Sequence, residues 1–179
     1  DHFSLKQYPF RLTPDSDFLY MSRSHARAKA YMDYAVVSRD GFVVITGEIG
    51  AGKTTLLNKL VGELPDDVLV AMVSQTQLNE FEFLQAVLAE LGFSRVEAGK
   101  VELLKQLKDY LVARYREGYH LLLVVDEAQS LGYRVLEEIR FLSGLETNHD
   151  KLVSVILAGQ PELGRVLEGA GRVHADVRG

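Results

Sequence analysis

Four short apolar runs with little polar alternation divide the chain. They are rich in valine, leucine and isoleucine and span residues 42–46, 68–74, 121–125 and 152–158. Continuous apolar runs of this length are typical of parallel strands that helices cover on both faces. The pattern therefore predicts a mostly parallel central sheet.

The segments between these runs have the spacing of amphipathic helices, with apolar side chains three and four residues apart. The predicted helices span residues 54–64, 80–91, 101–117 and 135–145, and another lies near 24–36, before the first strand. Strands that alternate with helices predict an α/β fold of three layers, in which ligands bind at the carboxyl ends of the strands. We expect polar residues that follow the apolar runs to carry the function.

The composition of the chain excludes several classes of protein. The 179 residues are 47% apolar and 25% charged, which is ordinary for a soluble globular protein, and the chain has no cysteine for a disulfide or a thiol nucleophile. The apolar runs are too short to cross a bilayer, and the first residues lack the order of a signal peptide, so we expect a cytoplasmic location. The formal net charge of −5 argues against a general nucleic-acid binder.

A glycine-rich segment after the first predicted strand carries the strongest chemical signal. Residues 47–54 fit the phosphate-binding pattern G-x-x-x-x-G-K-[ST], followed by Thr55. Glycines let backbone N–H groups approach phosphate oxygens, Lys53 supplies a positive charge for the β- and γ-phosphates, and the Thr54 hydroxyl suits Mg²⁺. The predicted nucleotide-binding residues are Gly47, Glu48, Ile49, Gly50, Ala51, Gly52, Lys53, Thr54 and Thr55. A plain glycine turn into a helix is the alternative.

Two adjacent acids, Asp126 and Glu127, end the third apolar run. We expect this run to lie beside the strand that precedes the P-loop, which would bring both acids to the phosphates. There Asp126, with Thr54, would hold magnesium, and Glu127 would polarise the water that attacks the γ-phosphate. Adjacent acids at a strand end are otherwise ordinary solvated residues.

Gln160 follows the fourth run and is the candidate to sense the γ-phosphate or orient the water. An equal alternative is a turn residue before a helix that Pro161 opens. Residues 74–76, which follow the second run, are weaker candidates to contact Glu127 or the water. His25 lies on a basic helix face that either is solvated or approaches the nucleotide. Each late arginine, at positions 134, 140, 165, 172 and 178, is an arginine-finger candidate or an ordinary surface residue.

Many short motifs recur in order along residues 3–165 and resemble one family. They include Pro9-Phe10, 18–22 with His25, 41–55, 124–129 and 158–163. Together these residues resemble the AAA+ ATPase domain of the general secretion pathway protein A (ExeA type) family, and equally the ATPases of exosortase/PEP-CTERM loci.

The resemblance implies an AAA+ fold, ATP and Mg²⁺ as ligands, assembly into a homo-oligomeric ring, and work at the cytoplasmic face of the inner membrane. The partner would be a secretin or polysaccharide-export system. Residues 1–40 would form a lead-in and helix of the ATPase module and 41–179 its core. After Leu167 the chain departs from the family pattern, and the helical lid has no counterpart.

Two other functions fit the same motifs. One is a DNA-associated AAA+ regulator of the transposition type, against which the acidic net charge stands. The other is a nucleotide-gated scaffold with little hydrolysis, in which ATP sets a conformation that a partner reads.

Overall fold

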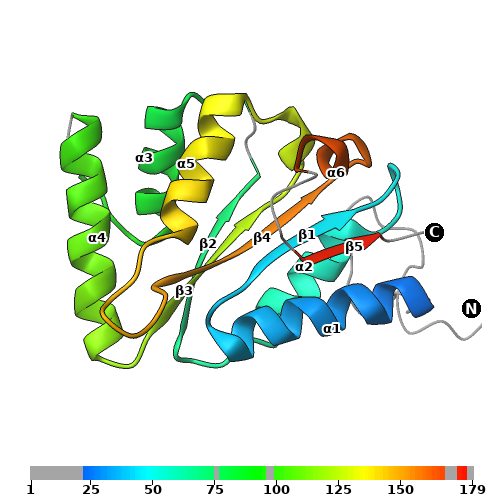
Figure 1. Cartoon of the computed structure of the whole chain (residues 1–179), viewed down its shortest axis with the longest axis horizontal. Helices are drawn as coiled ribbons and strands as arrows, with labels where there is room; N and C mark the ends of the chain where they lie inside the picture. The colour runs from blue at the N-terminus through cyan, green and yellow to red at the C-terminus, as the bar shows by residue number, and fades with distance from the viewer. Residues whose placement is uncertain (1–21, 75–76, 96–98, 168–172, 177–179) are drawn as a thin grey trace, which may run out of the picture.

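The computed structural model describes residues 22–74, 77–95, 99–167 and, for the backbone alone, 173–176. A single sheet of parallel strands crosses the molecule, with helices on both sides (Figure 1). The strand order is β2-β3-β4-β1-β5. The strands are β1 (Phe42–Thr46), β2 (Val68–Val73), β3 (His120–Val125), β4 (Val153–Gly159) and β5 (Val173–Asp176).

Six α-helices and one short 3-10 helix connect and cover the strands in the described part of the chain. They are α1 (Arg23–Ser38), α2 (Lys53–Gly62), α3 (Glu80–Glu90), α4 (Lys100–Arg116), η2 (Ala128–Ser130), α5 (Tyr133–Ser143) and α6 (Glu162–Leu167). Figure 1 shows α1 and α2 on one face of the sheet and α3, α4 and α5 on the other. The predicted α/β fold of three layers is confirmed.

Successive side chains along each strand point to opposite faces of the sheet and pack in two separate cores. On β3, Leu121 and Leu123 pack in the core under α3, α4 and α5, whereas Leu122 and Val124 pack in the core under α1 and α2. All six residues of β3 are buried, because helices cover both faces of this central strand. The two covered faces explain why its sequence is a continuous apolar run.

Local sequence signals set several helix ends. Ser22 caps α1 by accepting from the His25 backbone N–H, and Asn79 and Glu82 form a reciprocal capping box at α3. The predicted helices are confirmed with ends that shift by one or two residues. Pro161 precedes α6 directly, as expected for a proline that opens a helix.

The strand β5 was not predicted from the sequence pattern. It pairs with β1 alone and forms one edge of the sheet. Its four residues contain only two apolar ones, in alternation, and so lack the apolar run that marks the buried strands.

Candidate nucleotide-binding site

The glycine-rich loop lies between the carboxyl end of β1 and the start of α2, as predicted. Gly50 and Gly52 have φ angles of 79° and 84°, in the left-handed region that side-chain-bearing residues rarely adopt. A Cβ at Gly50 would meet no atom within 4 Å, so the backbone conformation, and not space, requires glycine there. The loop is anchored to the sheet by the Gly47 N–H, which donates to the Gly159 carbonyl on β4 at 3.1 Å.

Lys53, the first residue of α2, is buried inside the curve of this loop, with 6% of its surface exposed. Its ammonium donates to the carbonyls of Gly47 and Glu48 at 2.7 and 2.9 Å. The first N–H groups of a helix lack intrahelical partners and attract anions. A phosphate oxygen would be a stronger, charged acceptor for the same ammonium. The loop, the lysine and the helix start therefore fit a phosphate group.

The nine predicted nucleotide-binding residues all lie on this β1–α2 connection and the first turn of α2. Ile49 is 82% exposed at the loop tip, whereas Ala51 is buried. The part that each plays in binding stays a prediction.

Thr54 and Asp126 meet although 72 residues separate them. The Thr54 hydroxyl donates to the Asp126 carboxylate, Oδ2, at 2.6 Å. Asp126 is 3% exposed, and its N–H donates to the Val73 carbonyl on β2 at 3.0 Å. A hydroxyl beside a carboxylate is the oxygen donor set that Mg²⁺ accepts.

No group of three or more His, Cys, Asp or Glu side chains that could hold a metal gathers within the described ranges. Protein-bound Mg²⁺ usually has one or two protein ligands, and phosphates and waters supply the others. The pair of Thr54 and Asp126 therefore fits magnesium as a companion of a nucleotide.

One expectation about the sheet is wrong. The strand that carries the acids, β3, does not lie beside β1, because β4 lies between them. The acids reach the P-loop through α2, whose first turn places Thr54 against Asp126. The intervening β4 places its own carboxyl end, with Gln160, between the loop and the acids.

Glu127 has an unusual backbone, with φ 53° and ψ 34°, just before η2. This left-handed conformation costs a residue with a Cβ roughly 1–2 kcal/mol. Strained residues of this kind concentrate at functional sites. The Glu127 N–H donates to Asp126 Oδ1 at 2.9 Å, and its carbonyl accepts from the Ser130 N–H at 3.1 Å.

Gln129 connects the acids to the end of β4 and is a contact that the sequence analysis missed. Its side-chain Nε2 donates to Glu127 Oε2 at 2.6 Å, and its Oε1 accepts from the Gln160 backbone N–H at 3.0 Å. The structure thus brings Gln160 into the site through its backbone. A role for its half-buried side chain stays a prediction. Ser74 follows β2 and is exposed, and Gln75 and Thr76 lie outside the described residues.

His25 also touches the P-loop, so its alternative as a solvated residue is wrong. It is 6% exposed, and its Nε2 lies 2.7 Å from the Ala51 carbonyl, with its Nδ1 2.6 Å from the Ser22 hydroxyl. A carbonyl only accepts, so Nε2 carries the proton in this contact. The helix α1 thereby supports the loop from behind. The sequence could not predict this contact, because it shows only that His25 lies on a helix before β1.

An arginine-finger role for any of the late arginines stays a prediction. Arg134 and Arg140 are largely exposed and pair with Glu80 and Glu137 at 3.5 and 3.7 Å. Arg172 and Arg178 lie outside the residues with described side chains.

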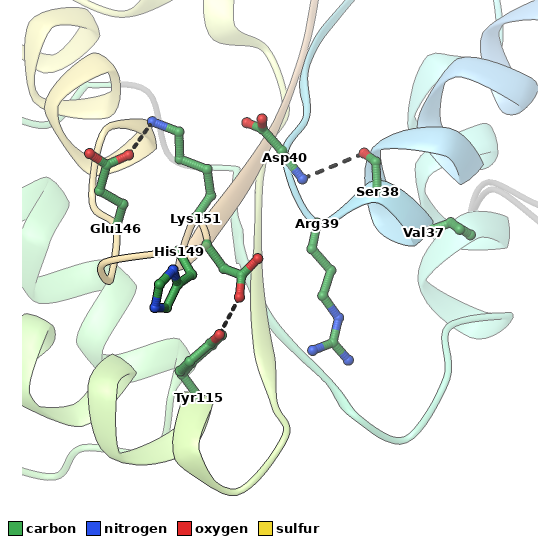
Figure 2. Close-up of a pocket in the computed structure, with 9 residues that line it drawn as sticks. Val37, Ser38, Arg39, Asp40, Tyr115, Glu146, His149 and Lys151 are labelled. Carbon is green, nitrogen blue, oxygen red and sulfur yellow. Dashed lines mark hydrogen bonds and ion pairs between the residues drawn. The ribbon is translucent and has the colours of Figure 1, made fainter.

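A second pocket, of about 580 Å³, opens at the opposite edge of the sheet, where β1, β3 and β4 begin (Figure 2). Segments 37–40 and 146–151 line it together with Tyr115. Lys151 pairs with Glu146 at 3.1 Å, and Tyr115 donates to Asp150, a hydrogen bond that raises the pKa of the tyrosine. These lining groups pair with one another, and the pocket lacks the glycine loop and buried cation of the first site.

Comparison with known proteins agrees with this geometry. Residues 36–167 match the family model described as AAA domain. The chain is 39% identical over 167 residues to general secretion pathway protein A of Aeromonas hydrophila, a match that covers 92% of this chain and 30% of that protein. The chain thus spans about a third of the length of this curated relative.

Solved structures with the same fold include ORC proteins of two organisms. The Aeropyrum pernix ORC2 protein in its ADP form has a TM-score of 0.66 at 19% identity, covering 91% of this chain and 51% of that one. The Drosophila ORC bound to DNA has a TM-score of 0.69 at 15% identity, covering 92% and 44%. At these identities the likeness shows the fold alone.

Proposed function

The chain belongs to the AAA domain family, as an AAA+ ATPase of the general secretion pathway protein A (ExeA) type. From this premise we propose that it binds ATP with Mg²⁺ and hydrolyses the bond to the γ-phosphate. The observation that carries the proposal is the contact between Thr54 and Asp126 at the mouth of the P-loop. It joins the phosphate-binding segment to the strand end that bears the acids.

Each residue of the site has a distinct part in this proposal. The loop amides and Lys53 bind the β- and γ-phosphates, and Lys53 exchanges its two carbonyl acceptors for phosphate oxygens. Thr54 and Asp126 would hold Mg²⁺, which neutralises charge that develops on the phosphates.

Glu127 acts as the base in the hydrolytic step. Its carboxylate accepts a proton from a water whose oxygen forms a bond to the γ-phosphorus. The bond from that phosphorus to the bridging oxygen of the β-phosphate breaks, and the electron pair leaves with ADP. Gln160, at the end of β4, is proposed to orient the same water or to sense the γ-phosphate.

The test is Glu127→Gln, a change that keeps the size of the side chain and its hydrogen bonding but removes the base. We expect MgATP binding to persist and turnover to fall about 100-fold or more, a loss at the lower end of what a general base supplies. Fluorescent-nucleotide titration and phosphate release measure the two quantities. Unchanged turnover in the variant would refute the role of Glu127, and no ATP binding by the unmodified chain would refute the proposal.

The setting of this activity is proposed from the secretion relative. We propose that the chain acts at the cytoplasmic face of the inner membrane as part of a homo-oligomer that drives or gates assembly of an envelope secretion or polysaccharide-export system. In the described residues, the helices are all too short or too polar to span a membrane. DNA stays outside the proposal, because the DNA-bound neighbour shares only the fold and the net charge is −5.

A further inference from the structure

Gln129 joins the end of β3 to the end of β4 through both atoms of its side-chain amide. The amide donates to the Glu127 carboxylate at 2.6 Å and accepts from the Gln160 backbone N–H at 3.0 Å. A carboxylate only accepts and a backbone N–H only donates, so a single orientation of the amide satisfies both partners. The amide thus supplies the donor that one partner needs and the acceptor that the other needs.

Gly159 leaves the space that this bridge needs. A Cβ at Gly159 would lie 2.6 Å from Gln129 Oε1, closer than normal contacts allow, and 3.1 Å from the Gln129 backbone nitrogen, which is a tight contact. The carbonyl of the same glycine accepts from the Gly47 N–H, at the start of the P-loop. The P-loop, the end of β4 and the Glu127 carboxylate are thus joined by three hydrogen bonds.

Glu127 needs such support because its side chain is exposed and its backbone is strained. A free glutamate side chain has several rotamers, and a base must lie within hydrogen-bond reach of the water that it activates. We propose that Gln129 is a positioning residue for hydrolysis. It holds the Glu127 carboxylate in one place and couples the position of that carboxylate to the position of the turn at residues 159–160. The inference rests on the proposed function, since without hydrolysis there is no base to position.

The test compares Gln129→Glu with Gln129→Leu. The glutamate variant keeps the length of the side chain and the acceptor for Gln160, but places a second carboxylate against Glu127. The leucine variant removes both hydrogen bonds. Because displacing a catalytic group by about 1 Å costs about 100-fold, we expect kcat for MgATP to fall about 10- to 100-fold in both, with an unchanged Kd for ATP.

The division of the loss between kcat and ATP affinity separates positioning from a general structural defect. A misplaced base slows hydrolysis and leaves phosphate binding by the P-loop intact, whereas a distorted site also raises the Kd for ATP. Gly159→Ala provides an independent probe: its methyl group displaces the amide, and we expect the same loss of kcat without a change at position 129.

The matched control is Gln106→Glu on α4. Gln106 also donates through Nε2, to the Arg95 carbonyl at 3.3 Å, and this variant should keep the kcat of the unmodified chain. Wild-type kcat in both Gln129 variants, a raised kcat, or a loss that lies entirely in ATP affinity would overturn the role of Gln129. If the unmodified chain binds ATP without turnover, the proposed hydrolysis and this role fall together. Should the leucine variant fail to fold, the isosteric glutamate variant decides the question.

Discussion

His120 shows how a single buried residue sets a pH dependence. It begins β3 and is 3% exposed, with Nε2 2.8 Å from the Ser154 hydroxyl. Ser154 itself donates to the Ala35 carbonyl at 3.1 Å, so Nε2 carries the proton, and the buried Nδ1 has no hydrogen-bond partner among the described residues. A proton on Nδ1 would be a charge without an acceptor. Burial, with a smaller contribution from Arg39, lowers the pKa of His120 to about 4.

This shift predicts that stability falls as the pH drops from about 6.5 to about 4. In that window the unfolded chain binds the proton and the folded chain does not, so protonation favours unfolding; below it both states are protonated. At 1.36 kcal/mol per pKa unit, the contribution lost across the window is about 3 kcal/mol. We expect His120→Gln, which cannot titrate, to flatten the curve of unfolding free energy against pH, measured by urea denaturation.

The control for this prediction is His149→Gln, at an exposed histidine before β4. Its pH curve should run parallel to that of the unmodified chain. A His120→Gln curve that also ran parallel would contradict the assignment.

At the scale of elements, the approach of α1 to β1 depends on Gly41. A Cβ there would lie 2.3 Å from the Cβ of Ala35, which is fully buried on α1. The Gly41 carbonyl also accepts from the Val155 N–H at 2.8 Å, which fixes the entry to β1 against β4. The chain therefore has no room to move away at this position.

We predict that Gly41→Ala lowers the free energy of unfolding by about 1–3 kcal/mol, the usual cost of overpacking. The control is Gly62→Ala at the end of α2, where an added Cβ meets nothing within 4 Å. There the higher helix propensity of alanine should leave stability unchanged or raise it by up to about 1 kcal/mol. Urea denaturation followed by circular dichroism compares the two. Equal effects would show that close approach does not determine the outcome at Gly41.

At the scale of the whole molecule, nucleotide binding should stabilise the fold. A ligand at 100 times its Kd adds about 2.7 kcal/mol when it binds the folded state alone. For a domain of this size each kcal/mol raises Tm by about 2–4 °C, so we expect a shift of about 5–11 °C with MgATP. Differential scanning fluorimetry measures it, and the part of the shift that EDTA removes reports the contribution of Mg²⁺.

Lys53→Met is the matched variant for this experiment. It removes the buried ammonium and keeps the apolar stem, so the ATP-induced shift should disappear. The Tm without ATP should change little, because the lost hydrogen bonds are offset by the removed desolvation cost of a buried charge. Lys59→Met, in the last turn of α2, should keep the full shift. A full ATP shift in Lys53→Met would contradict the proposed phosphate site.

The sequence by itself determined the fold class and the core of the site. Four strands were readable because helices cover both faces of the sheet and favour apolar residues in succession, and the P-loop was readable because its spacing is local. The strand β5 was not, because its four residues contain only two apolar side chains and form no apolar run.

Only the tertiary structure decided how the site is assembled. The sheet order places β4 between β1 and β3, and sequence periodicity carries no record of which parallel strands are neighbours. The same holds for the contacts of His25 with the P-loop and of Gln129 with Glu127 and Gln160. Each depends on where separate elements meet in space, and a hydrogen bond across such a meeting leaves no pattern along the chain.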